Sequence, residues 1–158
     1  MGAPIINDVA TDLDNPPVWT TIKKGPLPED FKAAIRDYYK ELKPLVLTQT
    51  SSTHKHEVFE AALAEAKAGV RWRLTHVDEA AGVIEGIAVT RVLRFRDDFV
   101  IRLTEPPVMA ATAGQDAASL RVDMRSASRL GKGDLGANAN RIQAYMAALT
   151  ARLGAASQ

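Results

Sequence analysis

Residues 82–103 read GVIEGIAVTRVLRFRDDFVIRL, and this stretch decides the fold. It is rich in Val, Ile and Phe, the residue types that strands favour. Two runs, 82–95 and 98–104, are predicted as strands, with RDD (96–98) as a link of hairpin length. Strands joined by so short a link pair antiparallel. The stretch therefore predicts an antiparallel hairpin, around which the neighbouring segments can be assigned.

Three further strands and three helices are predicted on either side of this hairpin. The strands are 45–50, 70–77 and 119–128; the helices are PEDFKAAIRDYYKEL (28–42), a segment between Ser52 or Thr53 and Gly69, and about 135–153. The order is a helix followed by β-α-β-β-β-β-α, with two helices on one face of the sheet. It predicts an α+β two-layer domain with a curved antiparallel sheet, like that of the TATA-binding protein, plus an extra N-terminal helix. A helix-grip arrangement is the alternative.

The composition is that of one ordinary globular domain. The chain has 158 residues, of which 46% are hydrophobic and 25% charged. We predict an N-terminal extended segment, 1–28, packed on a single α+β domain, 29–154. The net charge of +1 gives no general attraction to nucleic acid, so no nucleic-acid partner is expected. The absence of cysteine excludes disulfides and thiolate chemistry. No apolar run has the length of a transmembrane segment.

Alternation along the strands predicts two chemically different faces of the sheet. The apolar face is expected to meet the helices and consists of Val70, Trp72, Leu74, Val83, Ile87, Val89, Leu93, Phe95, Phe99, Ile101, Leu103, Leu120, Val122 and Met124. The opposite face combines small residues with arginines and consists of Arg71, Arg73, Gly86, Ala88, Thr90, Arg94, Val100, Arg102, Arg121, Asp123 and Arg125.

The arginines of the second face predict an anion-binding surface. Between Gly69 and Gly131 every lysine or arginine position holds Arg, although seven lysines precede Gly69. Arg makes planar bidentate contacts with carboxylates and phosphates that Lys cannot reproduce. The predicted ligand-binding residues are Arg71, Arg73, Arg102, Arg121 and Arg125, and the small residues Gly86, Ala88 and Thr90 would leave room for the ligand. The structural alternative is that carboxylates use these charges, either across strands or from an N-terminal segment carrying Asp8, Asp12 and Asp14.

The loop GKGDLG (131–136) raises the question of a phosphate cradle at the start of the last helix. Its spacing matches neither a P-loop nor a dinucleotide-binding fingerprint. Asp134 stands at the N-cap position, where its carboxylate would accept the free N–H groups and repel an anion. We therefore interpret the loop as a connection between a strand and a helix. The residues of this motif are Ser126, Ser128, Arg129, Asp134, Asn138 and Arg141, and Arg141 is expected to pair with Asp134 or Asp123.

No other pattern predicts catalysis, a metal or a cofactor. His54 and His56 lie two positions apart, which places them on different sides of a helix. Asp97 and Asp98 are interpreted as part of a turn, since adjacent residues of a strand point to opposite faces. No catalytic residue, metal ligand or cofactor is therefore predicted.

Four segments together give a resemblance to a known family. They are INDVATDLDNPP, ALAEAKAGVRWRL, GVIEGIAVTRVLRFRDDFVIRL and RVDMRSASRLGKGDLGANANRI. The sequence resembles the bacterial and chloroplast family called domain of unknown function 1499 (DUF1499), from about Pro4 to Leu153. The family pattern places an aromatic-Gly-Phe sequence before the aspartate pair, where this chain has Leu93-Arg94-Phe95. The resemblance implies that the Arg, Ser, Asp and Asn residues matter to the family, and it implies no reaction.

The function expected from these patterns is a non-catalytic binding or interaction domain. Its partner would be an anionic or amphiphilic small molecule or lipid, or a protein. The resemblance implies a bacterial protein that is periplasmic or membrane-associated. Two alternatives stay open: an enzyme of unknown reaction built around Arg125, Ser126, Arg129 and Asp134, and a structural subunit that pairs through an edge strand.

Overall fold

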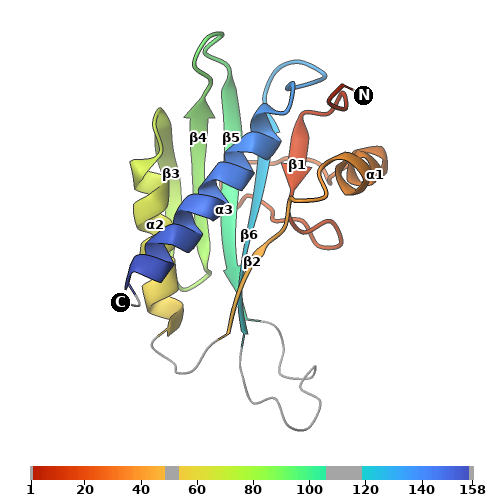
Figure 1. The fold of residues 1–158 in the computed structure, drawn as a ribbon. Helices are drawn as coiled ribbons and strands as arrows, with labels where there is room; N and C mark the ends of the chain where they lie inside the picture. Colours follow the sequence, from red (N-terminus) through yellow and green to blue (C-terminus); the bar gives the residue numbers. More distant parts are fainter. Residues whose placement is uncertain (1, 49–53, 106–118, 157–158) are drawn as a thin grey trace, which may run out of the picture.

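Six antiparallel strands form one open sheet in the computed structural model, which describes residues 2–48, 54–105 and 119–156 (Figure 1). The strands are β1 (Asp8–Ala10), β2 (Leu45–Thr48), β3 (Trp72–Asp78), β4 (Val83–Val89), β5 (Arg96–Thr104) and β6 (Ser119–Ser128). The helices are α1 (Glu29–Tyr38), α2 (His54–Ala68) and α3 (Ala137–Ala156). The predicted class, α+β with an antiparallel sheet, is confirmed.

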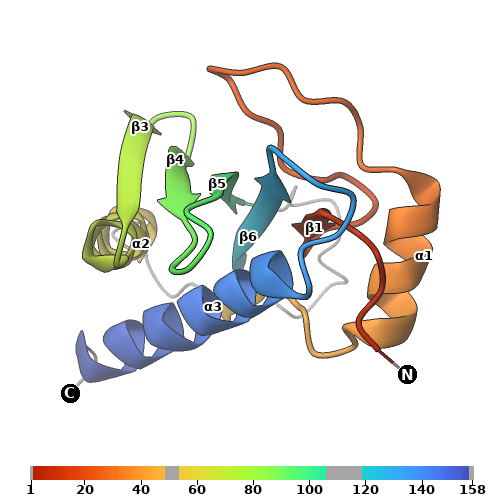
Figure 2. The ribbon, with the colours of Figure 1, turned by 90° about the horizontal axis from the view of Figure 1, so that it is seen from above.

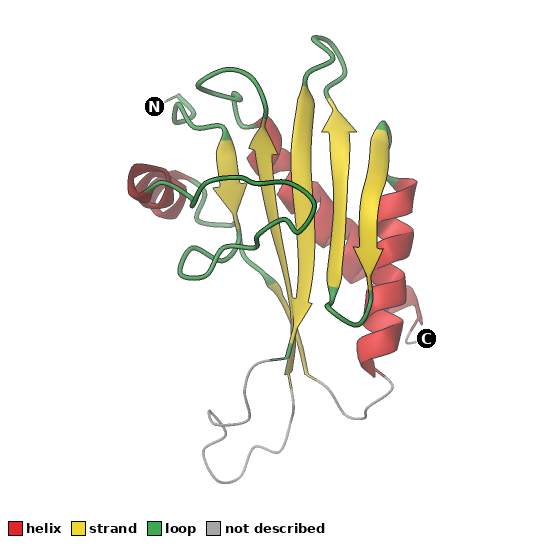
Figure 3. Cartoon of the chain, turned by 180° about the vertical axis from the view of Figure 1, so that it is seen from behind, coloured by secondary structure: helices red, strands yellow, loops and turns green. Residues whose placement is uncertain are grey.

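The sheet order is β1-β6-β5-β4-β3, and β2 also pairs with β6. β1 pairs with the C-terminal part of β6, where Val9 is opposite Ser126, and β2 pairs with its N-terminal part, where Leu45 is opposite Val122. Two short strands therefore lie end to end along one long strand (Figure 3). β1 was not predicted, because three residues are too few to show alternation. The specific likeness to the TATA-binding protein stays a prediction.

Helices α2 and α3 cover one face of the sheet, and α1 lies beside β1 at its edge (Figure 2). On α2, the predicted stripe is Val58, Phe59, Ala62, Leu63 and Ala66; four of these residues are buried and Leu63 is half-buried. The hydroxyl of Tyr145 on α3 donates to the carbonyl of Ala62 on α2, which ties the two helices together. We call the sheet face opposite α2 and α3 the outer face.

The hairpin between β4 and β5 turns earlier than predicted. Thr90 N–H donates to the Phe95 carbonyl at 2.9 Å and so closes a four-residue loop, 91–94. Arg94 in this loop has φ +57°, the left-handed conformation that glycine adopts most easily. The prediction of RDD as the turn is wrong: Asp97 and Asp98 belong to β5 and are buried on its two faces.

The predicted faces of β4 are consequently exchanged. Gly86 is opposite Phe99 and Ala88 is opposite Asp97, so both small residues point toward the helices. A Cβ on Gly86 would lie 2.4 Å from Phe99 Cζ, which means that the aromatic ring fills the space expected for a ligand. Val83, Ile87 and Val89 lie on the outer face instead, opposite Arg102, Asp98 and Arg96. The pattern misled because β4 is apolar on both faces and so carries no clear alternation.

Two helices, α1 and α3, also have boundaries that differ from prediction. α1 ends at Tyr38 rather than at Leu42, and α3 passes through Gly154 to Ala156. The last helix was predicted to begin at about residue 135, with Leu135 on its apolar face, but α3 begins at Ala137, and Leu135 lies outside it at φ +52° and is 93% exposed.

Strand β3 is an edge of the sheet and bears on the edge-pairing hypothesis. Its register to β4 shifts between Leu74 and His76, and Arg73 is exposed. Bulges and charged side chains are the usual means by which proteins protect an edge strand from pairing. The structural-subunit role stays a prediction that these features do not favour.

Candidate anion-binding site

The N-terminal segment between β1 and α1 crosses part of the outer face. Trp19 packs against Val100 and Ala127 in a small apolar cluster there. The fully buried carboxylate of Glu85 accepts hydrogen bonds from both the backbone N–H and the hydroxyl of Thr20 and Thr21. Burial alone would raise the pKa of Glu85, but these hydrogen bonds outweigh it and lower the pKa below its usual value. The segment is therefore held to the sheet by a buried charge as well as by apolar packing.

Three of the five predicted ligand-binding arginines are paired with carboxylates near this segment. Arg125 is 1% exposed and makes a bidentate contact with Asp8, at 2.9 Å from Nε and 2.7 Å from Nη2. Arg102 Nη2 lies 3.0 Å from Asp12 Oδ2. Arg121 Nε lies 2.7 Å from Asp123 Oδ2, and this hydrogen bond raises the pKa of Arg121. We call Arg102, Arg121 and Arg125 the covered arginines.

The covered arginines therefore match the structural alternative from the sequence analysis, in which carboxylates of the protein itself pair with these charges. Asp12 also lies 3.4 Å from Arg121 Nη2, so the aspartate from the segment joins two strands. The Arg125 guanidinium stacks over Trp19 with 5.0 Å between Cζ and the ring centroid. An external anion would have to displace these carboxylates to reach the three guanidinium groups.

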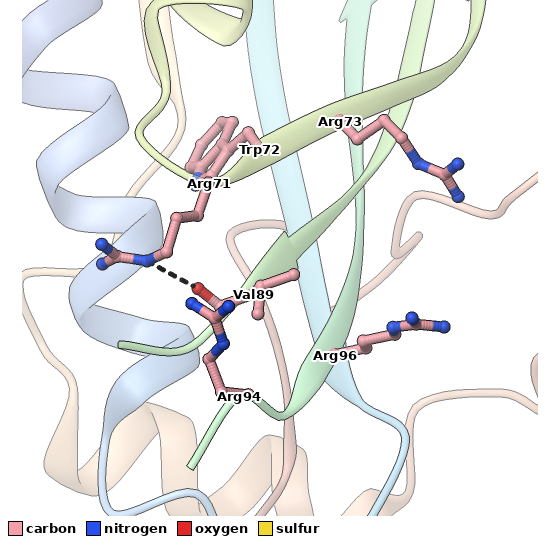
Figure 4. Close-up of a pocket in the computed structure, with 6 residues that line it drawn as sticks. All are labelled: Arg71, Trp72, Arg73, Val89, Arg94 and Arg96. Atoms are coloured by element: carbon pink, nitrogen blue, oxygen red, sulfur yellow. Dashed lines mark hydrogen bonds between the residues drawn. The ribbon is translucent and has the colours of Figure 1, made fainter. Parts of the chain in front are cut away.

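At the end of the sheet where β3 and β5 begin and β4 ends, four arginines line a groove of about 440 Å³ (Figure 4). The groove is lined by Arg71, Trp72, Arg73, Val89, Arg94 and Arg96. We call Arg71, Arg73, Arg94 and Arg96 the open arginines. Figure 4 shows Arg73 and Arg96 extending to one side, and Arg71 and Arg94 near Val89.

No carboxylate lines this groove. Arg71 Nε donates to the Val89 carbonyl at 3.2 Å, and the described residues provide no hydrogen bond or ion pair for the side chains of Arg73, Arg94 or Arg96. Four guanidinium groups that share one groove repel each other, and a bound anion relieves that repulsion. The groove thus offers the bidentate donors that a phosphate or carboxylate requires.

Of the predicted ligand-binding residues, only Arg71 and Arg73 lie in this groove. Arg94 had been placed on the arginine face but not among the ligand residues, and Arg96 had been assigned to a turn. The available signal was the density of arginine in RVLRFR (91–96), which contains no acidic residue to pair with it.

The residues of the closing motif form a buried polar network on the helix side of the sheet. Ser126 Oγ donates to Asn138 Oδ1 at 2.7 Å, and Asn138 Nδ2 donates to Ser128 Oγ at 2.9 Å. Arg141 contacts Asp97 at 2.6 Å, rather than Asp134 or Asp123 as expected. Asp134 accepts the backbone N–H of Asn138 at 3.1 Å in the first turn of α3, as expected of a capping carboxylate, although it lies two positions before Gly136, the residue at the N-cap position.

This network does not unite the four residues of the enzyme hypothesis. Arg125 points to the outer face and Ser126 to the helices, since they are adjacent in β6. Arg129 is bound to Asp98 at 2.8 Å on the outer face, and Asp134 is used by the start of α3. Each side chain has an internal partner, and the lining of the arginine groove includes none of them.

One group of potential metal ligands comes together at an exposed site. His56 and Glu60 of α2 and Glu79 of the β3–β4 turn each offer a ligand atom within 4.8 Å of the others. Sequence reasoning missed the group because Glu79 is distant in the chain. The hydrogen bond that His56 Nδ1 makes to the Glu79 carboxylate raises the pKa of His56. The side chain of His54 lies outside the described residues.

Comparison with known proteins supports the resemblance found in the sequence. The model of the family described as protein of unknown function (DUF1499) matches residues 8–149. The chain belongs to the DUF1499 family. No curated protein matches it. Among the described residues of this DUF1499 chain, none of the helices is long and apolar enough to cross a bilayer.

Proposed function

We propose that this DUF1499 protein is a non-catalytic binding domain whose open arginines hold the anionic group of a ligand. The observation that carries the proposal is the contrast in pairing: the covered arginines have carboxylate partners, whereas the groove of the open arginines has none. Among the residues that the structure describes, the arginines of this groove are thus available for an external anion.

The ligand class follows from the lining of the groove. Guanidinium groups select phosphate or carboxylate through paired N–H donors, and Trp72 and Val89 add apolar surface beside them. An anionic amphiphile satisfies both kinds of contact. A periplasmic or membrane-associated setting in a bacterium is part of the same proposal. The TATA-binding-protein-like topology, if present, would not imply DNA binding.

The test compares a groove variant with a charge-matched control. Arg73→Gln/Arg96→Gln removes two open arginines, and Arg36→Gln/Arg152→Gln removes two exposed arginines elsewhere. The probes are pyrophosphate, as a free phosphate, and dispersed lysophosphatidylglycerol, as a lipid headgroup, both followed by titration calorimetry.

We expect the groove variant to bind at least about tenfold more weakly, because two charge-assisted hydrogen-bonding groups are lost. The control should bind like wild type. Both variants should keep the wild-type free energy of unfolding within about 0.5 kcal/mol, as is usual for surface changes. Equal binding of both probes by all three proteins would refute the proposed function.

A further inference from the structure

Two loops lie at the same end of the sheet, close to the arginine groove. They are the β4–β5 loop, 90–95, and the β6–α3 loop, 129–136, and Figure 1 shows both at this end. Arg129 N–H donates to the Arg96 carbonyl at 3.2 Å, which joins the second loop to the base of the first. The two loops therefore form one continuous end of the molecule.

The start of the chain belongs to this end as well. Asp134 N–H donates to the Ile6 carbonyl at 3.0 Å, and Asn7 Nδ2 donates to the Gly131 carbonyl at 2.6 Å. A Cβ on Gly133 would lie 3.2 Å from Ile5 Cγ2, so Ile5 rests on the second loop.

Large apolar side chains are concentrated at this end. Six of the eleven exposed large hydrophobic residues among the described residues occur here: Ile5, Val92, Leu93, Phe95, Leu130 and Leu135. We call these six residues the apolar tip. Val92 is 82% exposed and Leu135 is 93% exposed. Exposed apolar residues that gather in one region indicate an interaction surface, whereas single ones do not.

The backbone holds these side chains outward. Leu135 has φ +52°, a conformation that is unfavourable for a residue with a Cβ. Asp134 fixes this geometry, because its Oδ2 accepts the Asn138 N–H at 3.1 Å while its backbone N–H is bound by Ile6. In the other loop, the Phe95 N–H donates to Thr90 Oγ1 at 2.9 Å and keeps Val92 and Leu93 at the apex.

Positive charge surrounds the apolar tip. The two loops contain Arg91, Arg94, Arg129 and Lys132, with Arg96 directly after the first loop, and the single carboxylate of the loops is Asp134. Both oxygens of that carboxylate accept backbone N–H groups of the α3 start, and Arg129 is paired with Asp98. The remaining four cations have no carboxylate partner among the residues that the structure describes.

Apolar side chains at loop apices, ringed by unpaired cations, are the chemistry that binds an anionic bilayer. The apolar groups enter the headgroup region, and Arg and Lys contact the lipid phosphates. Long cationic side chains can extend their charge to the phosphates while their stems stay in apolar surroundings. An acidic protein surface would complement the charge but would not require apolar side chains on two separate loops.

We infer that the apolar tip docks this protein on the surface of an anionic lipid bilayer, with the sheet end-on to the membrane. This inference rests on the proposed function, because the open arginines beside the tip would receive the headgroup of a bilayer lipid. The lipid is thereby recognised at the membrane surface rather than extracted as a free molecule.

The experiment uses cosedimentation of the full chain with vesicles of phosphatidylcholine alone and of phosphatidylcholine with phosphatidylglycerol. Leu93→Asn/Leu135→Asn removes two apolar groups of the tip. Val46→Asn/Val77→Asn removes two exposed apolar groups from β2 and β3, outside the tip loops. Thermal unfolding of every variant checks that it is folded.

We expect wild type and the control to bind the vesicles that contain phosphatidylglycerol and not to bind vesicles of phosphatidylcholine alone. The tip variant should lose about tenfold or more of its partition onto anionic vesicles, because two side chains no longer insert. A Val92→Trp variant should show a blue-shifted emission on the same vesicles, whereas Val46→Trp should not.

Three results would overturn the inference. If wild type binds pyrophosphate but no vesicle, the proposed function is retained and docking on a membrane is rejected. If the tip variant binds vesicles like wild type, the protein binds the membrane through another surface, and the apolar tip is not the docking site. Binding of soluble polyglutamate in place of vesicles would indicate an acidic protein partner. The proposed function alone fails if vesicle binding depends on the tip and not on Arg73 and Arg96.

Discussion

The covered arginines and two of the open arginines, Arg73 and Arg96, lie on the outer face of one sheet and differ in what lies over them. Arg125 on β6 has Asp8 at 2.7 Å and Trp19 stacked on it. Arg73 on β3 has no carboxylate partner among the described residues, since the N-terminal segment crosses near β5 and β6 and leaves the groove uncovered. The comparison teaches that an arginine stabilises the fold where a segment supplies a carboxylate, and is free for a ligand elsewhere.

The largest expected effect is the loss of a covered arginine. Arg125→Met leaves Asp8 without its partner in a region that excludes water, and breaking such a buried pair costs about 3–5 kcal/mol. Urea unfolding should show this loss of free energy of unfolding. Asp8→Asn/Arg125→Met should recover part of it, since no isolated charge remains. If Arg125→Met lowers the free energy of unfolding no more than Arg73→Gln does, the distinction between covered and open arginines is wrong.

A smaller effect is expected where Glu85 holds the segment to the sheet. Glu85→Gln should reduce the free energy of unfolding by about 1–3 kcal/mol at neutral pH, because a buried charge acceptor for Thr20 and Thr21 is replaced by an amide.

The pH dependence of this effect has a defined sign. The folded-state pKa of Glu85 is lowered from 4.5, so the carboxylate contributes stability above that pH and loses it as the pH falls through the folded value. The difference between wild type and Glu85→Gln should therefore shrink below about pH 4.5. Glu41→Gln, at an exposed position, is the control, and a difference that stays constant with pH would contradict the role of Glu85.

The smallest effect on the free energy of unfolding, and one of opposite sign, is expected at the apolar tip. Leu135→Asn should raise the free energy of unfolding by up to about 1 kcal/mol, because Asn tolerates the left-handed conformation better than Leu. Leu130→Asn is the matched control: it is an exposed leucine of the same loop without positive φ. Equal unfolding free energies for both variants would show that Leu135 carries no backbone strain.

Regular amphipathic segments were predictable from the sequence, and segments buried on two sides were not. The stripe of α2 was read correctly because one side of a helix meets the core and the other meets water. β4 was misread because the helices bury Ile84 and the residues of the outer face bury Glu85 and Ile87. The alternation of apolar and polar residues reflects which side chains are buried, so it cannot tell the two faces of a strand apart when both are buried.

The sequence predicted the chemistry of the candidate site but did not predict which arginines line it. The arginine-only strands indicated an anion site, and Arg71 and Arg73 do line the groove. Arg94 and Arg96 were missed because the hairpin turn had been placed at residues 96–98 instead of 91–94. A shift of a few residues in a turn changes which side chains share a face.

The sequence by itself determined the α+β class, the family and the concentration of arginine on neighbouring strands, because these depend on residue types and on periodicity along the chain. The tertiary structure decided which arginines have partners. Asp8 meets Arg125, 117 positions away, and Asp12 meets Arg102, 90 positions away. Ion pairing depends on distance in space, and spacing along the sequence does not give that distance until the chain is folded.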